Sequence, residues 1–206
     1  MLKKIIFMGT PFFAVPILKS LYQNGYPISV VYTQPPQKSQ RGQKINKSSV
    51  QGISETLNLE FRTPVSLKNN KDEYEYLKEL NADIAIVVAY GQIIPKEILT
   101  LTKKGFINIH ASLLPKWRGA APIQRSIMNL DKQTGISIMK INEKLDTGPV
   151  CNSYKLDFKD NDKFIICEYA HHHDVVTKDE DLIPLAMTAV RRLEKLTTIN
   201  KKISIN

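Results

Sequence analysis

Two polar residues that close an apolar stretch, Asn108 and His110, could act together on one substrate atom. If this stretch is a strand, residues two apart point to the same face, so the amide and the imidazole lie side by side. An imidazole exchanges a proton near neutral pH, and an amide NH2 group can donate a hydrogen bond to a developing oxyanion. A structural histidine held by hydrogen bonds is the competing interpretation of this pair.

A carboxylate that could complete the set is Asp146, which precedes the turn sequence Thr147-Gly148-Pro149. A carboxylate beside an imidazole raises its basicity and fixes its orientation. Aspartate-containing turns with glycine are common, so Asp146 taken alone indicates little. The three residue types together are suited to proton transfer and to stabilising an oxyanion.

The segments that would position these groups alternate between strand and helix. Apolar runs at 4–8 and 84–89 are typical of strands buried on both faces, and we expect a further strand at 106–109. Shorter segments rich in β-branched and apolar residues are also typical of strands. Between the strands, apolar residues recur at the spacing of helices. We expect strands also at 28–33, 59–63 and 136–141, and helices at about 13–24, 48–57, 72–80, 93–101 and 120–130. This order predicts an α/β fold with an open, mostly parallel, Rossmann-like sheet and flanking helices, whose ligands bind beyond the carboxyl ends of the strands.

Length and composition exclude several classes of protein. The 206 residues suffice for one globular domain of ordinary size, and no apolar run approaches the roughly 20 residues that span a bilayer. The start lacks the features of an export signal, and the two cysteines, Cys151 and Cys167, exclude a disulfide scaffold. We therefore expect a cytoplasmic protein without a membrane partner. The chain also lacks a three-glycine dinucleotide motif and a phosphate-binding P-loop, which disfavours dehydrogenases and nucleotide hydrolases.

Basic residues outnumber acidic ones by nine, and the whole excess lies in residues 1–160. The segment 34–51 carries four cations and no acidic residue: Lys38, Arg41, Lys44 and Lys47. Such a segment is either a solvated surface loop or a loop that binds the phosphates of a nucleic acid.

The string from Ser112 to Gln124, which contains the only tryptophan of the chain, is the most specific feature of the sequence. With residues 7–16, 89–95 and 145–149, it resembles the folate-dependent formyltransferases, most closely those that act on methionyl-tRNA. The resemblance covers about residues 1–158, in order and with similar spacing.

This resemblance implies transfer of a formyl group from 10-formyltetrahydrofolate to the amino group of methionyl initiator tRNA. It implies Asn108, His110 and Asp146 as the catalytic set, without a metal or a covalent intermediate. The implied folate site comprises Ser112, Leu113, Leu114 and Pro115, with Tyr90, Gly91 and Gln92 nearby. The implied tRNA contacts are Arg41, Lys44 and Lys47.

The resemblance divides the chain into a formyltransferase catalytic domain, 1–160, and a divergent tail, 161–206. Leucine spacing, acidic residues at the start and basic residues at the end predict one helix in the tail. We expect the carboxyl-terminal barrel of the family to be absent. Residues His171, His172 and His173 lack a second ligand cluster, so an exposed polar turn is favoured over a metal site.

Two other functions remain open at this point. One is formyl transfer to a small amine, such as glycinamide ribonucleotide or a sugar nucleotide; the basic loop and residues 117–122 favour tRNA instead. The other is a truncated, impaired remnant that binds folate or RNA without turnover. For an active enzyme we expect a monomer.

Overall fold

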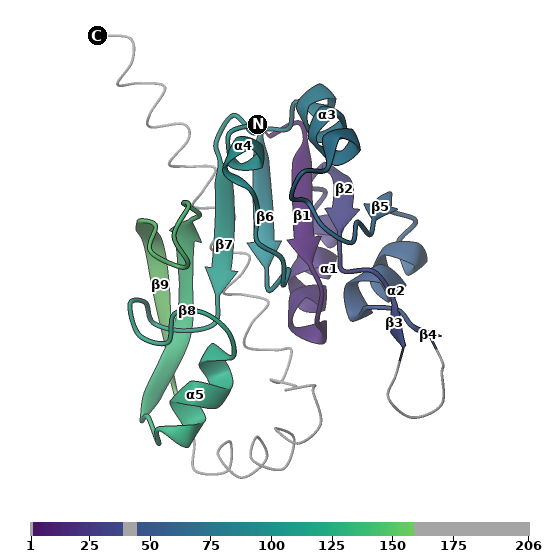
Figure 1. Ribbon diagram of the computed structural model, residues 1–206. Coiled ribbons are helices and arrows are strands. Elements are labelled where there is room, and N and C mark those ends of the chain that lie inside the picture. The colour runs from purple at the N-terminus through teal and green to yellow at the C-terminus, as the bar shows by residue number, and fades with distance from the viewer. Residues whose placement is uncertain (1, 39–44, 159–206) are drawn as a thin grey trace, which may run out of the picture.

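A seven-stranded sheet forms the centre of the computed structural model, which describes residues 2–38 and 45–158 (Figure 1). The strands lie in the order β5-β2-β1-β6-β7-β8-β9. The first five run parallel to one another, β8 is antiparallel to β7, and β9 is antiparallel to β8. The predicted mostly parallel α/β sheet is thus confirmed. The strands are β1 (Ile5–Gly9), β2 (Ile28–Tyr32), β5 (Phe61–Arg62), β6 (Ile84–Val88), β7 (Phe106–His110), β8 (Gln133–Lys140) and β9 (Val150–Asp157).

Helices cover both faces of the parallel part. On one face, α1 (Val15–Gln23), preceded by the 3-10 turn η1 (Phe12–Ala14), and α2 (Ser49–Thr56) pack against the sheet. On the other face lie α3 (Lys71–Leu80) and α4 (Lys96–Leu99). Alternate residues of β1 reach the two sides, so the strand is buried on both faces and reads as a continuous apolar run. The last helix of the described residues, α5 (Pro122–Met128), lies at the end of the sheet where β1, β6 and β7 finish (Figure 1).

Local sequence explains where the helices begin. Pro16 occupies the first turn of α1, where its missing N–H costs no hydrogen bond. The Ser48 hydroxyl accepts a hydrogen bond from the Gln51 amide and caps α2. Asn70 caps α3 in the same way, through the Glu73 amide.

Some elements differ from the sequence prediction. Strand β9 was not predicted, because its residues alternate between exposed and half-buried positions, and within the described residues it pairs only with β8. Helices α4 and α5 are shorter than expected, since each begins only at or after a proline. The cationic segment, expected as a loop, carries a short hairpin of β3 (Gln37–Lys38) and β4 (Ile45–Asn46). The predicted tail helix and the histidine cluster at 171–173 lie outside the described residues.

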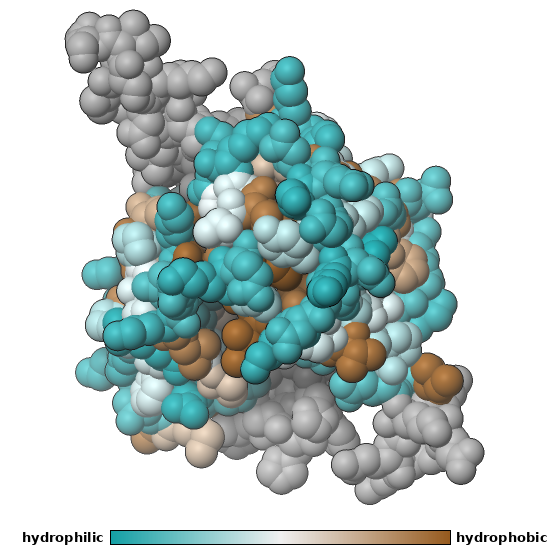
Figure 2. Space-filling view, turned by 45° about the horizontal axis from the view of Figure 1, so that its top comes forward, coloured by the Kyte–Doolittle hydropathy of each residue, from teal (hydrophilic) through white to brown (hydrophobic). Residues whose placement is uncertain are grey.

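The outer surface carries mainly polar side chains on the face seen in Figure 2, with smaller hydrophobic areas between them. In the part of the chain that the structure describes, no helix has the length and apolar character needed to cross a bilayer.

A buried ionic cluster fixes the short edge strand β5 to its neighbours. The Glu73 carboxylate accepts hydrogen bonds from Tyr32 at 2.6 Å and from Arg62 Nε at 2.8 Å and Nη2 at 3.0 Å. Burial and the adjacent Glu73 raise the pKa of Tyr32 well above its usual range, so its hydroxyl remains a donor. The cluster joins β2, β5 and α3.

Asp83 anchors the amino ends of β1 and β6. Its carboxylate accepts hydrogen bonds from the Lys3 amide at 2.6 Å, the Lys4 amide at 3.1 Å and Lys103 Nζ at 2.9 Å. Burial alone would raise the pKa of Asp83, but the hydrogen bonds from Lys3 and Lys103 outweigh burial and lower it to about 2.

We predict that Asp83→Asn lowers the free energy of unfolding at pH 7 and that this difference shrinks as the pH falls from 4 to 2. A carboxylate whose folded pKa is depressed stabilises the protein above its unfolded pKa, and that contribution is lost as the pH falls through the folded pKa. Urea unfolding at pH 7, 4 and 2.5 measures the effect. Glu79→Gln, on the exposed side of α3, is the control and should show no such trend. A difference that stays constant over this range would contradict the role assigned to Asp83.

Candidate active site

The site lies at the carboxyl ends of the central strands. Asn108 and His110 stand on β7, on the face opposite Ile107 and Ile109, which pack into the core beside α1. Asn108 pairs with β6 through Val87, and His110 pairs with β8 through Ser137. The two side chains therefore share a face, as the sequence spacing predicts.

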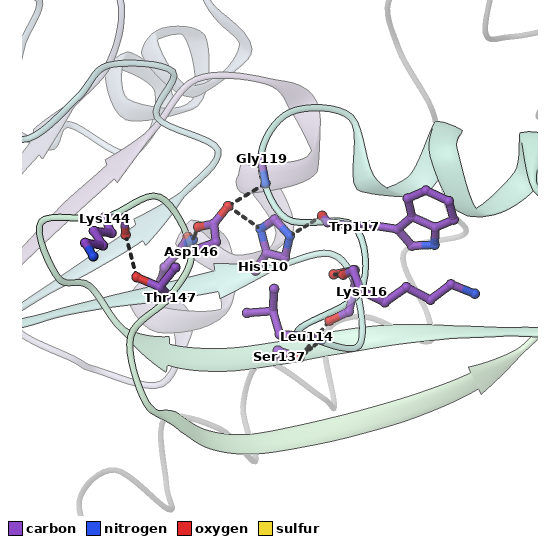
Figure 3. Close-up of polar contacts among 11 residues, drawn as sticks. His110, Leu114, Lys116, Trp117, Gly119, Ser137, Lys144, Asp146 and Thr147 are labelled. Carbon is purple, nitrogen blue, oxygen red and sulfur yellow. Dashed lines mark hydrogen bonds and ion pairs between the residues drawn. The ribbon is translucent and has the colours of Figure 1, made fainter.

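The Asp146 carboxylate meets both of them from the loop 141–149 between β8 and β9. Its Oδ1 accepts a hydrogen bond from Asn108 Nδ2 at 3.3 Å, and its Oδ2 lies 3.7 Å from His110 Nδ1. Oδ2 also accepts a hydrogen bond from the Gly119 amide at 2.8 Å (Figure 3). The structure thus brings the three predicted catalytic side chains together, with His110 and Asp146 almost fully buried.

The backbone of this loop is constrained. Asp146 has φ +47°, a left-handed conformation that aspartate tolerates better than most residues. Two residues later, a Cβ on Gly148 would overlap the carbonyl oxygen of Lys140. The absence of a side chain at Gly148 therefore allows the loop to press against β8 and present Asp146 to β7.

The His110 ring has an oxygen at each nitrogen. Nδ1 faces Asp146, and Nε2 lies 2.9 Å from the carbonyl oxygen of Trp117 (Figure 3). A neutral imidazole has one N–H, whereas the imidazolium has two. With a proton on Nε2 the ring donates a hydrogen bond to the Trp117 carbonyl, and Nδ1 then faces the Asp146 carboxylate at ion-pair distance.

The loop after β7 is held by serine hydroxyls. Ser112 Oγ donates to the Lys116 carbonyl at 2.6 Å, while Ser137 Oγ on β8 donates to the Ser112 carbonyl at 2.7 Å. Ser137 Oγ also accepts from the Leu114 amide at 2.9 Å. Residues 112–115, which the resemblance assigns to the folate site, thus pack against β8 and are not among the residues that line the cleft described next.

A cleft of about 710 Å³ opens beside the polar set, within the usual size range of small-molecule sites. Asn108, His110 and Asp146 line it, and so does the predicted segment Tyr90, Gly91 and Gln92. Most of the remaining wall is apolar and was not assigned to the site from sequence: it includes Phe12, Phe13, Ile93, Ile94, Ile123, Ile141 and Leu145.

Hydrogen bonds between three strand ends hold the Tyr90–Gln92 wall. Thr10 Oγ1, after β1, donates to the Tyr90 carbonyl at 2.7 Å and accepts from the Gln34 amide at 3.3 Å. Gln34 Nε2, after β2, donates to the Gly91 carbonyl at 2.9 Å. Since Gln34 begins the cationic segment, this segment is attached directly to the wall of the cleft.

Of the three predicted tRNA contacts, the structure describes only Lys47; Arg41 and Lys44 lie outside the described residues. Lys47 Nζ lies 2.9 Å from both carboxylate oxygens of Glu55, and its side chain remains 56% exposed. This contact lowers the pKa of Glu55.

Two contacts of the site could not be read from residue types, because they come from the backbone: the Trp117 carbonyl and the Gly119 amide. Left-handed conformations at both residues, with φ +59° and +85°, direct these groups inward. Gly119, two residues after the tryptophan, is the only hint in the sequence. Within residues 2–38 and 45–158, no three histidine, cysteine, aspartate or glutamate side chains form a group that could hold a metal ion.

Comparison with known proteins is consistent with this geometry. The model of the family described as formyl transferase matches residues 3–165. The chain belongs to this family. The predicted resemblance is thereby confirmed at the level of the family.

Curated members of the family share long stretches of sequence with the chain. It is 75% identical over 162 residues to a methionyl-tRNA formyltransferase of Pelagibacter ubique, covering 79% of this chain and 52% of that protein. It is 49% identical over 159 residues to that of Agrobacterium fabrum, covering 77% and 51%. The chain thus spans about half the length of the curated relatives it matches.

Solved structures of lower identity share the fold. The phosphoribosylglycinamide formyltransferase of Bacillus halodurans matches with a TM-score of 0.64 at 20% identity, over 82% of this chain and 88% of that one. A formyltetrahydrofolate deformylase of Pseudomonas syringae pv. tomato matches with a TM-score of 0.63 at 17% identity, over 82% and 56%.

We predict that Gly148→Ala displaces Asp146 and lowers the free energy of unfolding by about 1–3 kcal/mol, as overpacking commonly does. The added methyl group would force the loop away from Lys140, breaking the hydrogen bond from the Gly119 amide to Asp146. Urea unfolding and the NMR chemical shift of the Gly119 amide report the two effects.

The matched control is Gly52→Ala in α2, where a Cβ has open space. A helical glycine replaced by alanine without a clash should stabilise the protein by about 0.5–1 kcal/mol. Equal effects of the two substitutions, with an unmoved Gly119 resonance, would contradict the tight packing of the loop.

Proposed function

We propose that this chain transfers a formyl group from 10-formyltetrahydrofolate to the amino group of methionyl initiator tRNA, in the cytoplasm where translation begins. The observation that carries the proposal is the convergence of Asn108, His110 and Asp146 on one cleft. The 75% identity to a relative named methionyl-tRNA formyltransferase supports the acceptor. Both the folate donor and the tRNA acceptor are substrates in this proposal.

The chemistry accounts for the residue types. A neutral amine attacks the formyl carbon, giving a tetrahedral oxyanion whose nitrogen carries an extra proton. The bond from that carbon to folate N10 then breaks, and N10 takes up a proton. The site must stabilise the oxyanion and move one proton, which hydrogen-bond donors and an acid–base pair can do.

We assign oxyanion stabilisation first to Asn108. One N–H of its amide donates to Asp146, and the second N–H is left for the substrate. His110 supplies positive charge beside the same atom, and its direct contact with the oxyanion requires Nε2 to leave the Trp117 carbonyl. Asp146 keeps the ring oriented and charged and can relay the proton through a water molecule.

We place the donor in the cleft. Its apolar wall suits a flat ring, and the Tyr90–Gln92 backbone can meet the polar edge of that ring. The resemblance also assigns Ser112, Leu113, Leu114 and Pro115 to the donor. They do not line the cleft itself but lie in the loop beside it, which the hydroxyl network holds.

We assign acceptor binding to the cationic segment, through Arg41, Lys44 and Lys47. Because Gln34 joins this segment to the cleft wall, a bound tRNA would lie next to the formyl donor. Phosphate contacts of this kind weaken strongly as salt is added.

One assay separates the possible functions. The full chain is incubated with 10-formyltetrahydrofolate and with either charged initiator tRNA or small amines, glycinamide ribonucleotide among them. Transfer to tRNA supports the proposal, and transfer only to a small amine refutes the acceptor. Folate binding without any transfer refutes the activity and leaves a binding protein.

We predict that Asn108→Ala lowers kcat by about 10²–10³-fold, the usual effect of removing one oxyanion donor. His110→Ala should abolish measurable transfer, while folate affinity changes little in both variants. Stopped-flow or quenched-flow transfer assays and calorimetric folate titration measure the two properties. The control Asn152→Ala removes a strand asparagine of β9 that does not line the cleft and should retain activity. Near-normal turnover by purified His110→Ala would remove the assignment.

We predict that Arg41→Ala with Lys44→Ala raises KM for tRNA, reduces its salt dependence and leaves folate binding unchanged. The lost charges would no longer contact tRNA phosphates. The control pair is Lys68→Ala with Lys71→Ala, two exposed lysines just before and at the start of α3. Equal losses with tRNA and with a small amine acceptor would argue against this division of labour.

A further inference from the structure

Asp131, in the turn between α5 and β8, is a buried carboxylate that the mechanism above does not use. It is 9% exposed and accepts three side-chain hydrogen bonds. Trp117 Nε1 donates to Oδ2 at 2.7 Å, while Lys116 Nζ at 2.6 Å and Asn129 Nδ2 at 2.7 Å donate to Oδ1. Its own amide donates to the Ser126 carbonyl, which fixes its place at the end of α5.

Trp117 connects this carboxylate to the active site. Its indole points away from His110, whereas its carbonyl oxygen faces the imidazole (Figure 3). Trp117 also has φ +59°, a conformation that a bulky side chain adopts only when its surroundings enforce it. The hydrogen bond from the indole to Asp131 helps to hold this conformation, and it lies on the side of Trp117 opposite His110.

We propose that Asp131 is a positioning residue of this active site: it holds the Trp117 indole so that the Trp117 carbonyl faces His110 Nε2. His110 then lies between two oxygens, one from the Asp146 loop and one from the loop that Asp131 fixes. The effect on catalysis rests on the function proposed above, whereas the effect on the imidazole does not.

The charge of Asp131 suits this role. Its carboxylate accepts from an ammonium and an indole at once, and Lys116 Nζ lies 5.3 Å from the centre of the Trp117 ring. Burial raises the pKa of Asp131, but hydrogen bonds from Lys116, Asn129 and Trp117 outweigh it and hold that pKa below its usual value. An asparagine of the same shape would direct N–H groups at one of these donors and would lose the attraction to Lys116.

The test uses the fact that Trp117 is the only tryptophan of the chain, so its indole N–H gives one NMR signal and its fluorescence reports one site. In Asp131→Asn the indole N–H resonance should move upfield and the His110 ring 15N resonances should shift. Turnover should fall about 10- to 100-fold, since small misplacements of catalytic groups have effects of this size. KM for the formyl donor should change less than about threefold.

The control is Asp83→Asn, which removes another buried carboxylate with three donors, at the opposite end of the strands. It should lower stability while leaving the indole signal, the His110 signals and kcat unchanged. Trp117→Phe removes the indole donor but keeps the carboxylate, and should reproduce the shift of the His110 signals and the loss of turnover. Trp117→Phe therefore still tests the proposal if Asp131→Asn does not fold.

The outcomes are separable. If the indole signal moves while the His110 resonances and kcat do not, Asp131 is only a structural anchor and the proposal is overturned. If Asp83→Asn moves the His110 signals as much as Asp131→Asn does, the effect reflects general destabilisation and the proposal also fails. If the wild-type chain transfers no formyl group, the function is refuted, yet the His110 resonances still decide the positioning role.

Discussion

A buried imidazole between two oxygens is the interaction on which the rest of this site depends. His110 is 7% exposed, so its ring nitrogens have little access to water and need protein partners. Asp146 and the Trp117 carbonyl provide them, from two loops that are far apart in the chain. In an environment of low dielectric such contacts are stronger than in water, and leaving either nitrogen unpaired is correspondingly costly.

The fold supplies the precision that this interaction requires. Strand β7 is paired on both sides, to β6 and β8, which fixes the side on which Asn108 and His110 project. Close packing at Gly148 holds the loop that carries Asp146 against β8, and the hydroxyl network around Ser112 and Ser137 holds the loop after β7. The same strand ends form the wall of the cleft, so the polar set borders a largely apolar cavity.

The parts of the fold that were predicted from sequence are those with a strong local pattern. Strands β1 and β6 have continuous apolar sequences because both of their faces are covered. In β7 the Asn108–His110 spacing places both polar side chains on one face, as strand geometry requires. Strand β9 was missed because an edge strand needs only a weak pattern. Asp146 precedes a common type of turn, so its sequence context alone was weak and the family resemblance was needed to assign it to the site. The Trp117 carbonyl and Asp131 depend on tertiary contacts that residue types do not encode.

The most direct measurement is a crystal structure of the chain with a stable analogue of the formyl donor, such as 10-formyl-5,8-dideazafolate. We predict that the analogue binds in the cleft, with its formyl oxygen within about 3.2 Å of Asn108 Nδ2, hydrogen-bond distance for a group acting in the reaction. The formyl carbon should lie beside His110, with Asp146 still in contact with the ring. An analogue bound elsewhere, or a formyl group out of reach of all three side chains, would contradict the account.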